Sequence, residues 1–129
     1  MRLIGCEAAG LDLISMIAPT SHDRIKMIAA EAKGFVYCVL SLGVTGVRSE
    51  ITTDIGAMVS LVKEANPDIP CAVGFGISTP AQAEKIAAVS DGAIVGSAIV
   101  RLCEKYGSEA AGPIGEYVRS MKAAVLQKD

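Results

Sequence analysis

Three glycine-bearing segments stand where an apolar run of the sequence ends and a helical pattern begins. In chain order they are 43–46 (Gly-Val-Thr-Gly), 74–76 (Gly-Phe-Gly) and 96–97 (Gly-Ser). Glycine has no Cβ, so it lets backbone N–H groups approach an anion closely, and a helix N-terminus adds partial positive charge. Segment 96–97 combines both features, and Ser97 adds a hydroxyl donor. The three segments therefore predict that backbone amides bind a phosphate group.

A second interpretation of these glycines stays open. A Gly-x-Gly sequence after a strand also serves simply to make a tight turn. Gly76 and Gly96 lie about twenty residues apart, each next to a predicted strand end, and this repetition favours a phosphate site. The three segments contain no Lys or Arg, so the sequence predicts binding by backbone amides with modest affinity.

Around these segments the pattern alternates between strands and helices. Apolar and β-branched runs predict four strands, at 13–18, 35–40, 71–75 and 93–95. Helical spacing predicts five helices. The first lies between Ser21 and Gly34, the second covers about 53–65, and the third begins at Pro80 with Thr79 as its N-cap. A short helix follows from 96–98 to about Tyr106, and the last begins at Pro113. This order predicts one α/β domain over residues 1–129, with parallel strands. Strand ends in such proteins share one edge, where ligands bind.

Composition narrows the class of protein. The chain has 129 residues, 51% of them hydrophobic and only 4% aromatic, as is typical of a buried parallel sheet covered by helices. A net charge of −2 argues against a nucleic-acid partner. No apolar run reaches the roughly 18 residues of a membrane span, and the first residues lack the layout of a signal peptide. The sequence thus predicts a cytoplasmic chain with no membrane partner.

The cysteines support the same compartment. The chain contains four of them, with no Cys-x-x-Cys pair, and His22 is the single histidine, so no zinc or other metal site is predicted. Cys38 and Cys71 fall inside predicted strands, where they are expected to behave as small buried hydrophobes. Free thiols are typical of a reducing cytoplasm.

Four stretches together resemble one protein family. They are "GLDLISMIAPTS" (10–21), "SLGVTGVR" (41–48), "GFGISTPAQ" (74–82) and "GAIVGSAIV" (92–100). In order and spacing they resemble the C-terminal half of the tryptophan synthase α chain, strands five to eight of its (β/α)₈ barrel. The resemblance implies half of a TIM barrel, with four parallel βα units and extra C-terminal helices. A whole barrel takes about 250 residues.

The family is a carbon–carbon lyase of tryptophan biosynthesis, which cleaves indole-3-glycerol phosphate to indole and glyceraldehyde 3-phosphate. The resemblance implies no cofactor for this chain, since pyridoxal phosphate belongs to the β chain that receives the indole. It implies that the substrate phosphate is held by Gly46, Gly76, Gly96 and Ser97. It implies a substrate pocket formed by Tyr37, Thr45, Phe75, Ile77 and Ile94, with Tyr37 near the reacting atoms and Thr45 on a loop that orients a catalytic carboxylate.

The resemblance also implies that this chain holds no catalytic residue. The family's two catalytic carboxylates lie on early elements that the quoted stretches do not include. Asp12 precedes its strand and is expected at the opposite edge, while Glu50 and Asp54 are expected to be helix-start acids. We therefore expect a chain that is inactive without a complementing half.

Two alternatives stay open beside that expectation. One is a catalytically inactive half-barrel that self-associates and binds a phosphate or a phosphosugar. The other, less favoured by the quoted stretches, is a different phosphate-binding barrel enzyme. A lone half-barrel would expose two strand edges and an apolar face. The expected partners are therefore a phosphorylated small molecule, a second copy or a complementing N-terminal half-barrel, and a tryptophan synthase β chain.

Overall fold

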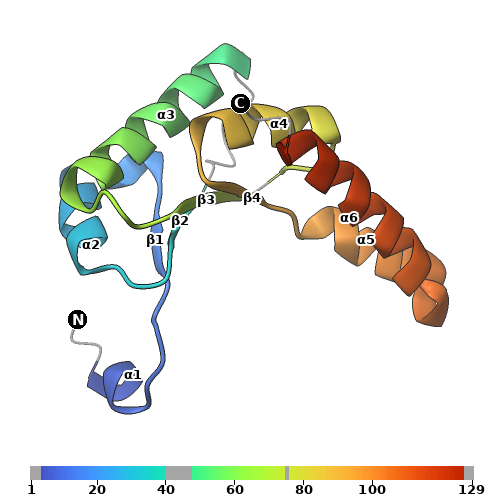
Figure 1. The fold of residues 1–129 in the computed structure, drawn as a ribbon, viewed down its shortest axis with the longest axis horizontal. Coiled ribbons are helices and arrows are strands. Elements are labelled where there is room, and N and C mark those ends of the chain that lie inside the picture. Colours follow the sequence, from blue (N-terminus) through green and yellow to red (C-terminus); the bar gives the residue numbers. More distant parts are fainter. Residues whose placement is uncertain (1–3, 40–47, 75, 127–129) are drawn as a thin grey trace.

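The computed structural model of the chain describes residues 4–39, 48–74 and 76–126. Within them, four strands form one sheet in the order β1-β2-β3-β4, and each neighbouring pair is parallel (Figure 1). The strands are β1 (Ser15–Ile17), β2 (Val36–Val39), β3 (Cys71–Gly74) and β4 (Gly92–Ile94). The predicted α/β class and the parallel order are confirmed.

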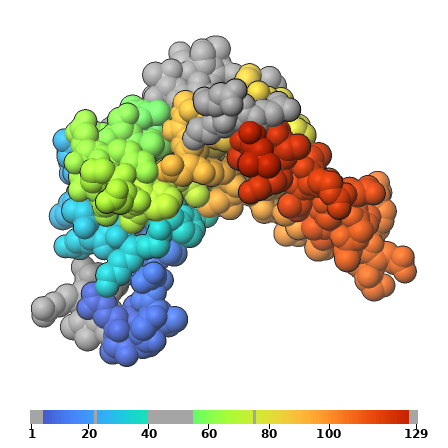
Figure 2. All heavy atoms as spheres, in the orientation of Figure 1, coloured from blue at the N-terminus to red at the C-terminus, as the bar shows by residue number. Residues whose placement is uncertain are grey.

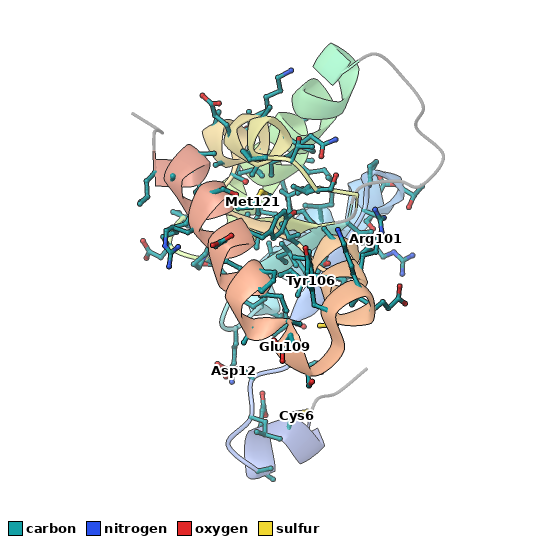
Figure 3. All side chains as sticks on the ribbon, turned by 90° about the vertical axis from the view of Figure 1, so that its right-hand side faces the viewer. Cys6, Asp12, Arg101, Tyr106, Glu109 and Met121 are labelled. Atoms are coloured by element: carbon teal, nitrogen blue, oxygen red, sulfur yellow. The ribbon has the colours of Figure 1, made fainter. Side chains whose placement is uncertain are left out.

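Helical segments separate the strands and follow the last one. They are α1 (Ile4–Ala8), the 3₁₀ segment η1 (Pro19–Arg24), α2 (Ile25–Glu31), α3 (Arg48–Ala65), α4 (Pro80–Val89), α5 (Ser97–Tyr106), the 3₁₀ segment η2 (Gly107–Glu109) and α6 (Ala111–Leu126). Helix α2 packs beside α3, α3 beside α4, and α6 beside both α4 and α5. Met121, labelled in Figure 3, brings α6 against the core of the molecule.

One face of the sheet is buried under helices and the other is open. Tyr37 is aligned with Met16 on one neighbouring strand and with Ala72 on the other, and strand side chains alternate between the two faces. Side chains on the covered face are almost inaccessible to solvent, and the core joins Ile17, Val36, Cys38, Cys71 and Val73 to Ile25, Ile55 and Val62 of the helices. On the other face, Met16 is 58% exposed. The alternation therefore directs Tyr37 away from the helices.

The open side of the sheet is visible as a hollow in the surface. In Figure 1, α2, α3 and α4 lie along one side of the sheet, α1 stands apart beyond β1, and α5 and α6 extend as a pair beyond β4. Figure 2 shows the molecule as an arch, hollowed between its N-terminal part and the α5–α6 pair. In the described residues, no helix is long and apolar enough to cross a membrane.

Polar contacts at the amino-terminal edge of the sheet hold the strand starts together. The Asp91 carboxylate accepts from the Cys71 backbone N–H at 2.8 Å and lies 2.9 Å from the Lys63 ammonium. Lys63 also donates to the Ile69 carbonyl at 2.6 Å. Asp12 lies at this edge as predicted: its carboxylate is beside Gly34, just before β2, and Figure 3 shows it far from Arg101.

Several element boundaries differ from the prediction. Helical backbone begins at Pro19, which suits a first turn because its missing N–H needs no partner there. Ser21, where the predicted helix was expected to begin, therefore lies inside the first turn, and its hydroxyl accepts from the Ala18 N–H at 3.2 Å. Helix α3 begins at Arg48 instead of near Thr53, because no glycine or proline interrupts residues 48–52.

The C-terminal boundaries differ in a similar way. Helix α6 begins at Ala111, two residues before Pro113, and proline is tolerated in a first helical turn. Between the predicted helix that ends near Tyr106 and the one predicted from Pro113, the structure has the short 3₁₀ segment η2. Helix α1 was not predicted at all. The predicted N-cap Thr79 is confirmed: its hydroxyl accepts from the Gln82 N–H at 3.2 Å, directly before Pro80.

The buried thiols give a test of this core. Cys38 and Cys71 are fully buried and the hydrogen bond between their side chains, together with burial, raises the pKa of the Cys38 thiol. Cys103 is exposed on α5. We expect Cys103 to react quickly with a thiol reagent, and Cys38 and Cys71 to react only when the protein unfolds, because both are buried out of reach of the reagent. Mass spectrometry of the labelled peptides over time, with and without urea, measures this. Equal labelling rates for Cys38 and Cys103 in the folded chain would contradict the assignment of faces.

Candidate functional site

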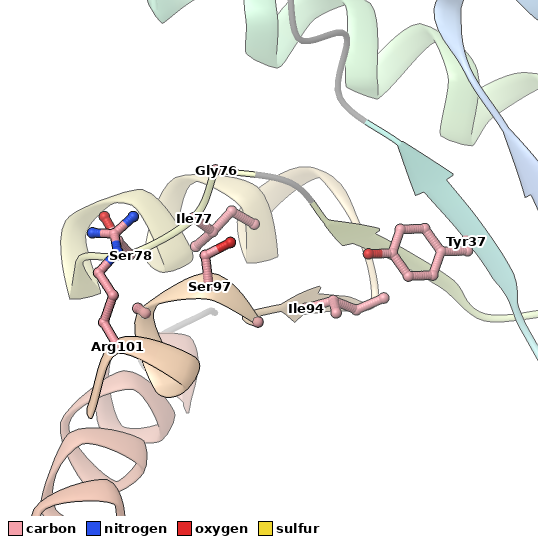
Figure 4. Close-up of a pocket in the computed structure, with 9 residues that line it drawn as sticks. Tyr37, Gly76, Ile77, Ser78, Ile94, Ser97 and Arg101 are labelled. Carbon is pink, nitrogen blue, oxygen red and sulfur yellow. The ribbon is translucent and has the colours of Figure 1, made fainter. Parts of the chain in front are cut away.

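A pocket of about 250 Å³ opens at the carboxyl ends of β3 and β4 (Figure 4). Its walls come from β2, from the segment that joins β3 to α4, from β4 and from the start of α5. The residues that line it are Tyr37, Gly76, Ile77, Ser78, Ile94, Gly96, Ser97, Ala98 and Arg101. Elements far apart in the sequence thus converge here because the parallel strands all end at the same edge.

The start of α5 supplies open backbone donors to the pocket. Gly96 is the N-cap of this helix, and its carbonyl accepts from the N–H groups of Ile99 (3.0 Å) and Val100 (3.1 Å). Gly96 has no side chain that could cap the helix, and the first N–H groups of a helix have no partner within it. Ser97 and Ala98, whose N–H groups have no partner within the helix, line the pocket at the positive end of the helix dipole.

The opposite wall, between β3 and α4, is fixed by its own side chains. The Gln82 side-chain oxygen accepts from the Ser78 N–H at 2.9 Å and from the Thr79 N–H at 3.1 Å. These two amides are already engaged, so they are not open donors for a ligand. Gly76, with φ +75°, adopts a backbone conformation that other residues rarely take, and it turns the chain into the pocket. Ile77 follows it and is 5% exposed.

A contact from the last helix holds the same wall in place. The Tyr117 hydroxyl of α6 donates to the Ser78 carbonyl at 2.5 Å. Burial raises the pKa of Tyr117, while the charge of Arg101 acts in the opposite direction. The hydroxyl is therefore protonated, and able to donate, at neutral pH. Tyr117 therefore links α6 to the pocket wall.

The ring of Tyr37 occupies the open face of the sheet over Gly74. A Cβ built on Gly74 would lie 2.7 Å from Cζ and 2.9 Å from Cε1 of that ring. Gly74 must therefore lack a side chain if Tyr37 is to lie across β3 toward Ile94 and the pocket (Figure 4).

Most of the site residues predicted from the sequence line this one pocket. Those brought together are Tyr37, Gly76, Ile77, Ile94, Gly96 and Ser97. Thr45, Gly46 and Phe75 lie outside the described residues. Sequence reasoning missed Arg101, because it searched only the loops for cations. The signal was present: Arg101 follows Ser97 by four residues, which places both on one face of α5.

Comparison with known proteins connects this fold and pocket to one family. The family model "Tryptophan synthase alpha chain" matches residues 4–125. The chain belongs to the tryptophan synthase alpha chain family. Among curated relatives, the alpha chain of Shouchella clausii is 48% identical over 125 residues, covering 90% of this chain and 46% of the relative. The alpha chain of Geobacillus stearothermophilus is 49% identical over 113 residues, covering 88% of this chain and 41% of the relative.

Solved structures agree with the sequence relatives. Tryptophan synthase of Mycobacterium tuberculosis superposes with a TM-score of 0.77 at 35% identity, covering 95% of this chain and 45% of that chain. The alpha subunit of Campylobacter jejuni superposes with a TM-score of 0.72 at 31% identity, covering 79% and 41%. Structural neighbours of this alpha-chain fold are TIM barrels. The chain spans less than half of the length of the curated relatives it matches.

The clearance between Gly74 and Tyr37 gives a test of the site's geometry. We expect Gly74→Ala to destabilise the chain by about 1–3 kcal/mol, because the new methyl group overlaps the Tyr37 ring. In a chain that also carries Tyr37→Ala, the same change should lower the free energy of unfolding by much less. Urea unfolding of the four chains in this cycle measures the coupling. Gly92→Ala in β4 is the control, since a Cβ there meets nothing within 4 Å. Additive effects of the two substitutions would show that the ring does not lie over Gly74.

Proposed function

We propose that this chain carries the phosphate-binding part of an indole-3-glycerol-phosphate site. The reaction implied for the family cleaves that substrate to indole and glyceraldehyde 3-phosphate in tryptophan biosynthesis. The observation that carries the proposal is the pocket of about 250 Å³ at the carboxyl ends of β3 and β4, where Gly76, Gly96 and Ser97 meet. Membership of the tryptophan synthase alpha chain family supports the choice of ligand.

Each wall of the pocket has a distinct part in this proposal. The phosphate lies against the start of α5, where the amides of Ser97 and Ala98 and the Ser97 hydroxyl donate to its oxygens. Gly76 and Gly96 let the backbone approach without a Cβ in the way. Tyr37, Ile77 and Ile94 form the largely apolar side, next to which the rest of the substrate lies. Thr45, Gly46 and Phe75 keep their proposed roles beside the substrate.

The same proposal makes the chain inactive by itself. The two catalytic carboxylates that the family resemblance implies belong to the part of the relatives that this chain does not match. In the described residues, no Asp or Glu lines the pocket. The chain alone therefore binds substrate phosphate but supplies neither a general acid nor a general base. Cleavage needs a complementing half-barrel that brings both carboxylates to the open side.

We propose that residues 1–129 form one half-barrel domain that functions with a partner. Within the described residues, β1 and β4 are the outer strands of the sheet, and each pairs along one side only. A complementing N-terminal half-barrel would pair with both edges and give eight strands. A tryptophan synthase β chain is the proposed recipient of the indole. We place the chain in the cytoplasm, because its cysteines are free thiols.

A second candidate function is a self-associating, catalytically inactive half-barrel that binds a phosphate or phosphosugar. The apolar side chains near β1 favour it: Leu11 is 62%, Leu13 44% and Met16 58% exposed. Apolar groups gathered in this way beside an unpaired strand edge favour association. Two copies related by a two-fold axis would cover them.

Binding of a phosphate ester by the isolated chain tests the first proposal. We expect glycerol 3-phosphate to bind weakly, and Ser97→Ala to lower the affinity roughly three- to tenfold, because one hydroxyl donor to a charged group is lost. Ser120→Ala is the control, since Ser120 is an exposed serine of α6 that does not line the pocket. Isothermal calorimetry or an amide-shift titration measures both.

Two outcomes would contradict the first proposal. One is equal weakening by the two serine substitutions, which would show that the ligand binds elsewhere. The other is release of indole from indole-3-glycerol phosphate by the purified chain alone, because the proposal assigns it no catalytic carboxylate.

Light scattering of the purified chain tests the second candidate. We expect twice the monomer mass, and a shift toward the monomer in Met16→Lys, because a charge on the open face opposes its burial. Met27→Lys is a matched control: Met27 is 59% exposed, on helix α2. A monomeric wild-type chain, or equal effects of the two substitutions, would argue against association through the open face.

A further inference from the structure

Arg101 is the cation of the proposed phosphate pocket, although the family resemblance assigns it no role. It lies on α5 one turn after Ser97 and lines the pocket. Figure 4 shows its side chain extending away from α5 in the direction of Ser78, which lines the same pocket. Arg101 thus lies between the two segments whose backbone bounds the phosphate position.

Among the side chains that the structure describes, which leave out those of residues 48–54, no carboxylate forms an ion pair with Arg101. The ion pairs found there are Lys26–Glu64, Lys33–Glu7 and Lys63–Asp91. Tyr117 on α6 is protonated at neutral pH, because burial raises its pKa, although the charge of Arg101 acts in the opposite direction. A full positive charge therefore remains at the mouth of the pocket, in a chain whose net charge is −2.

A full charge adds something that the backbone donors do not provide. The start of a helix carries about half of an elementary charge, and its N–H groups donate to any oxygen acceptor. A guanidinium group interacts with the net charge of the ligand and can donate two parallel hydrogen bonds to a phosphate. Its attraction for a dianion is therefore larger than its attraction for a monoanion of the same shape.

We propose that Arg101 determines the charge specificity of this pocket, so that it selects a dianionic phosphate monoester over a monoanionic diester. The inference rests on the proposed phosphate site and adds a selecting residue to it. Ser97 and the amides of α5 position the phosphate, while Arg101 discriminates by charge.

A comparison of two ligands at one pH tests the inference. Glycerol 3-phosphate is mainly a dianion at about pH 8, because the second pKa of a phosphate monoester is about 6. Its O-methyl diester keeps the glycerol and phosphate groups but carries one negative charge. We expect the wild-type chain to prefer the monoester, and Arg101→Gln to reduce that preference about fivefold, the upper range for an exposed ion pair. Calorimetric titration of each ligand gives the two ratios.

Matched variants separate charge selection from a structural role. Arg101→Lys keeps the charge and should retain most of the preference. Arg119→Gln removes the same charge from an exposed position of α6 outside the pocket lining, and should leave the preference unchanged. Circular dichroism confirms that each variant is folded.

Distinct results would overturn the inference. If Arg101→Gln weakens both ligands equally, or neither, Arg101 does not discriminate by charge, although the proposed phosphate site stands as long as the wild-type chain binds glycerol 3-phosphate. If Arg119→Gln lowers the preference as much as Arg101→Gln, the effect belongs to net charge and not to the pocket. If the wild-type chain binds neither ligand, the proposed site and the inference fail together.

Discussion

Burial of one face of the parallel sheet beneath α2, α3 and α4 is the constraint on which the rest of the structure depends. Strand side chains alternate, so once Val36 and Cys38 are committed to the helix side, Tyr37 between them must point the other way. A one-residue slip of β2 would exchange these faces and bury the tyrosine under the helices. The hydrophobic core therefore determines which side chains are available to a ligand.

The same constraint brings the chemistry to one edge. Parallel strands joined by helices end on the same side of the sheet. The turns after β3 and β4 therefore lie close together, although a whole helix and a strand separate them in the sequence. The backbone donors of the two turns differ. The Gln82 side chain accepts from the amides of Ser78 and Thr79 before α4, whereas Gly96 has no side chain that could accept from the first amides of α5. The Tyr117 hydroxyl of α6 donates a hydrogen bond to Ser78, in the turn after β3. The result is one rigid wall and one wall that offers open donors.

Much of this arrangement could be predicted from the sequence. The glycines at strand ends, the Thr79-Pro80 helix start and the alternation of strands and helices are local signals, and each identifies its element or turn without knowledge of packing. The errors at element ends have a local cause as well. Helix α3 begins at Arg48, earlier than predicted, because residues 48–52 contain no glycine or proline that would end it. The four-residue spacing from Ser97 places Arg101 on the same face of α5, but the position of that face against the pocket and the Tyr117–Ser78 contact could not be derived in that way. They depend on the rotation of α5 about its axis and on the place where α6 packs, which are set by contacts between residues far apart in the chain.

The central claim is that the turns after β3 and β4 together hold a phosphate, and a crystal structure of the chain grown with glycerol 3-phosphate tests it most directly. The account predicts phosphate density between Gly76 and the start of α5, with an oxygen at about 2.7–3.2 Å from the Ser97 amide. A phosphate bound elsewhere, or an empty pocket at saturating ligand, would contradict it. In that case the glycines of these turns would serve the geometry of the chain alone.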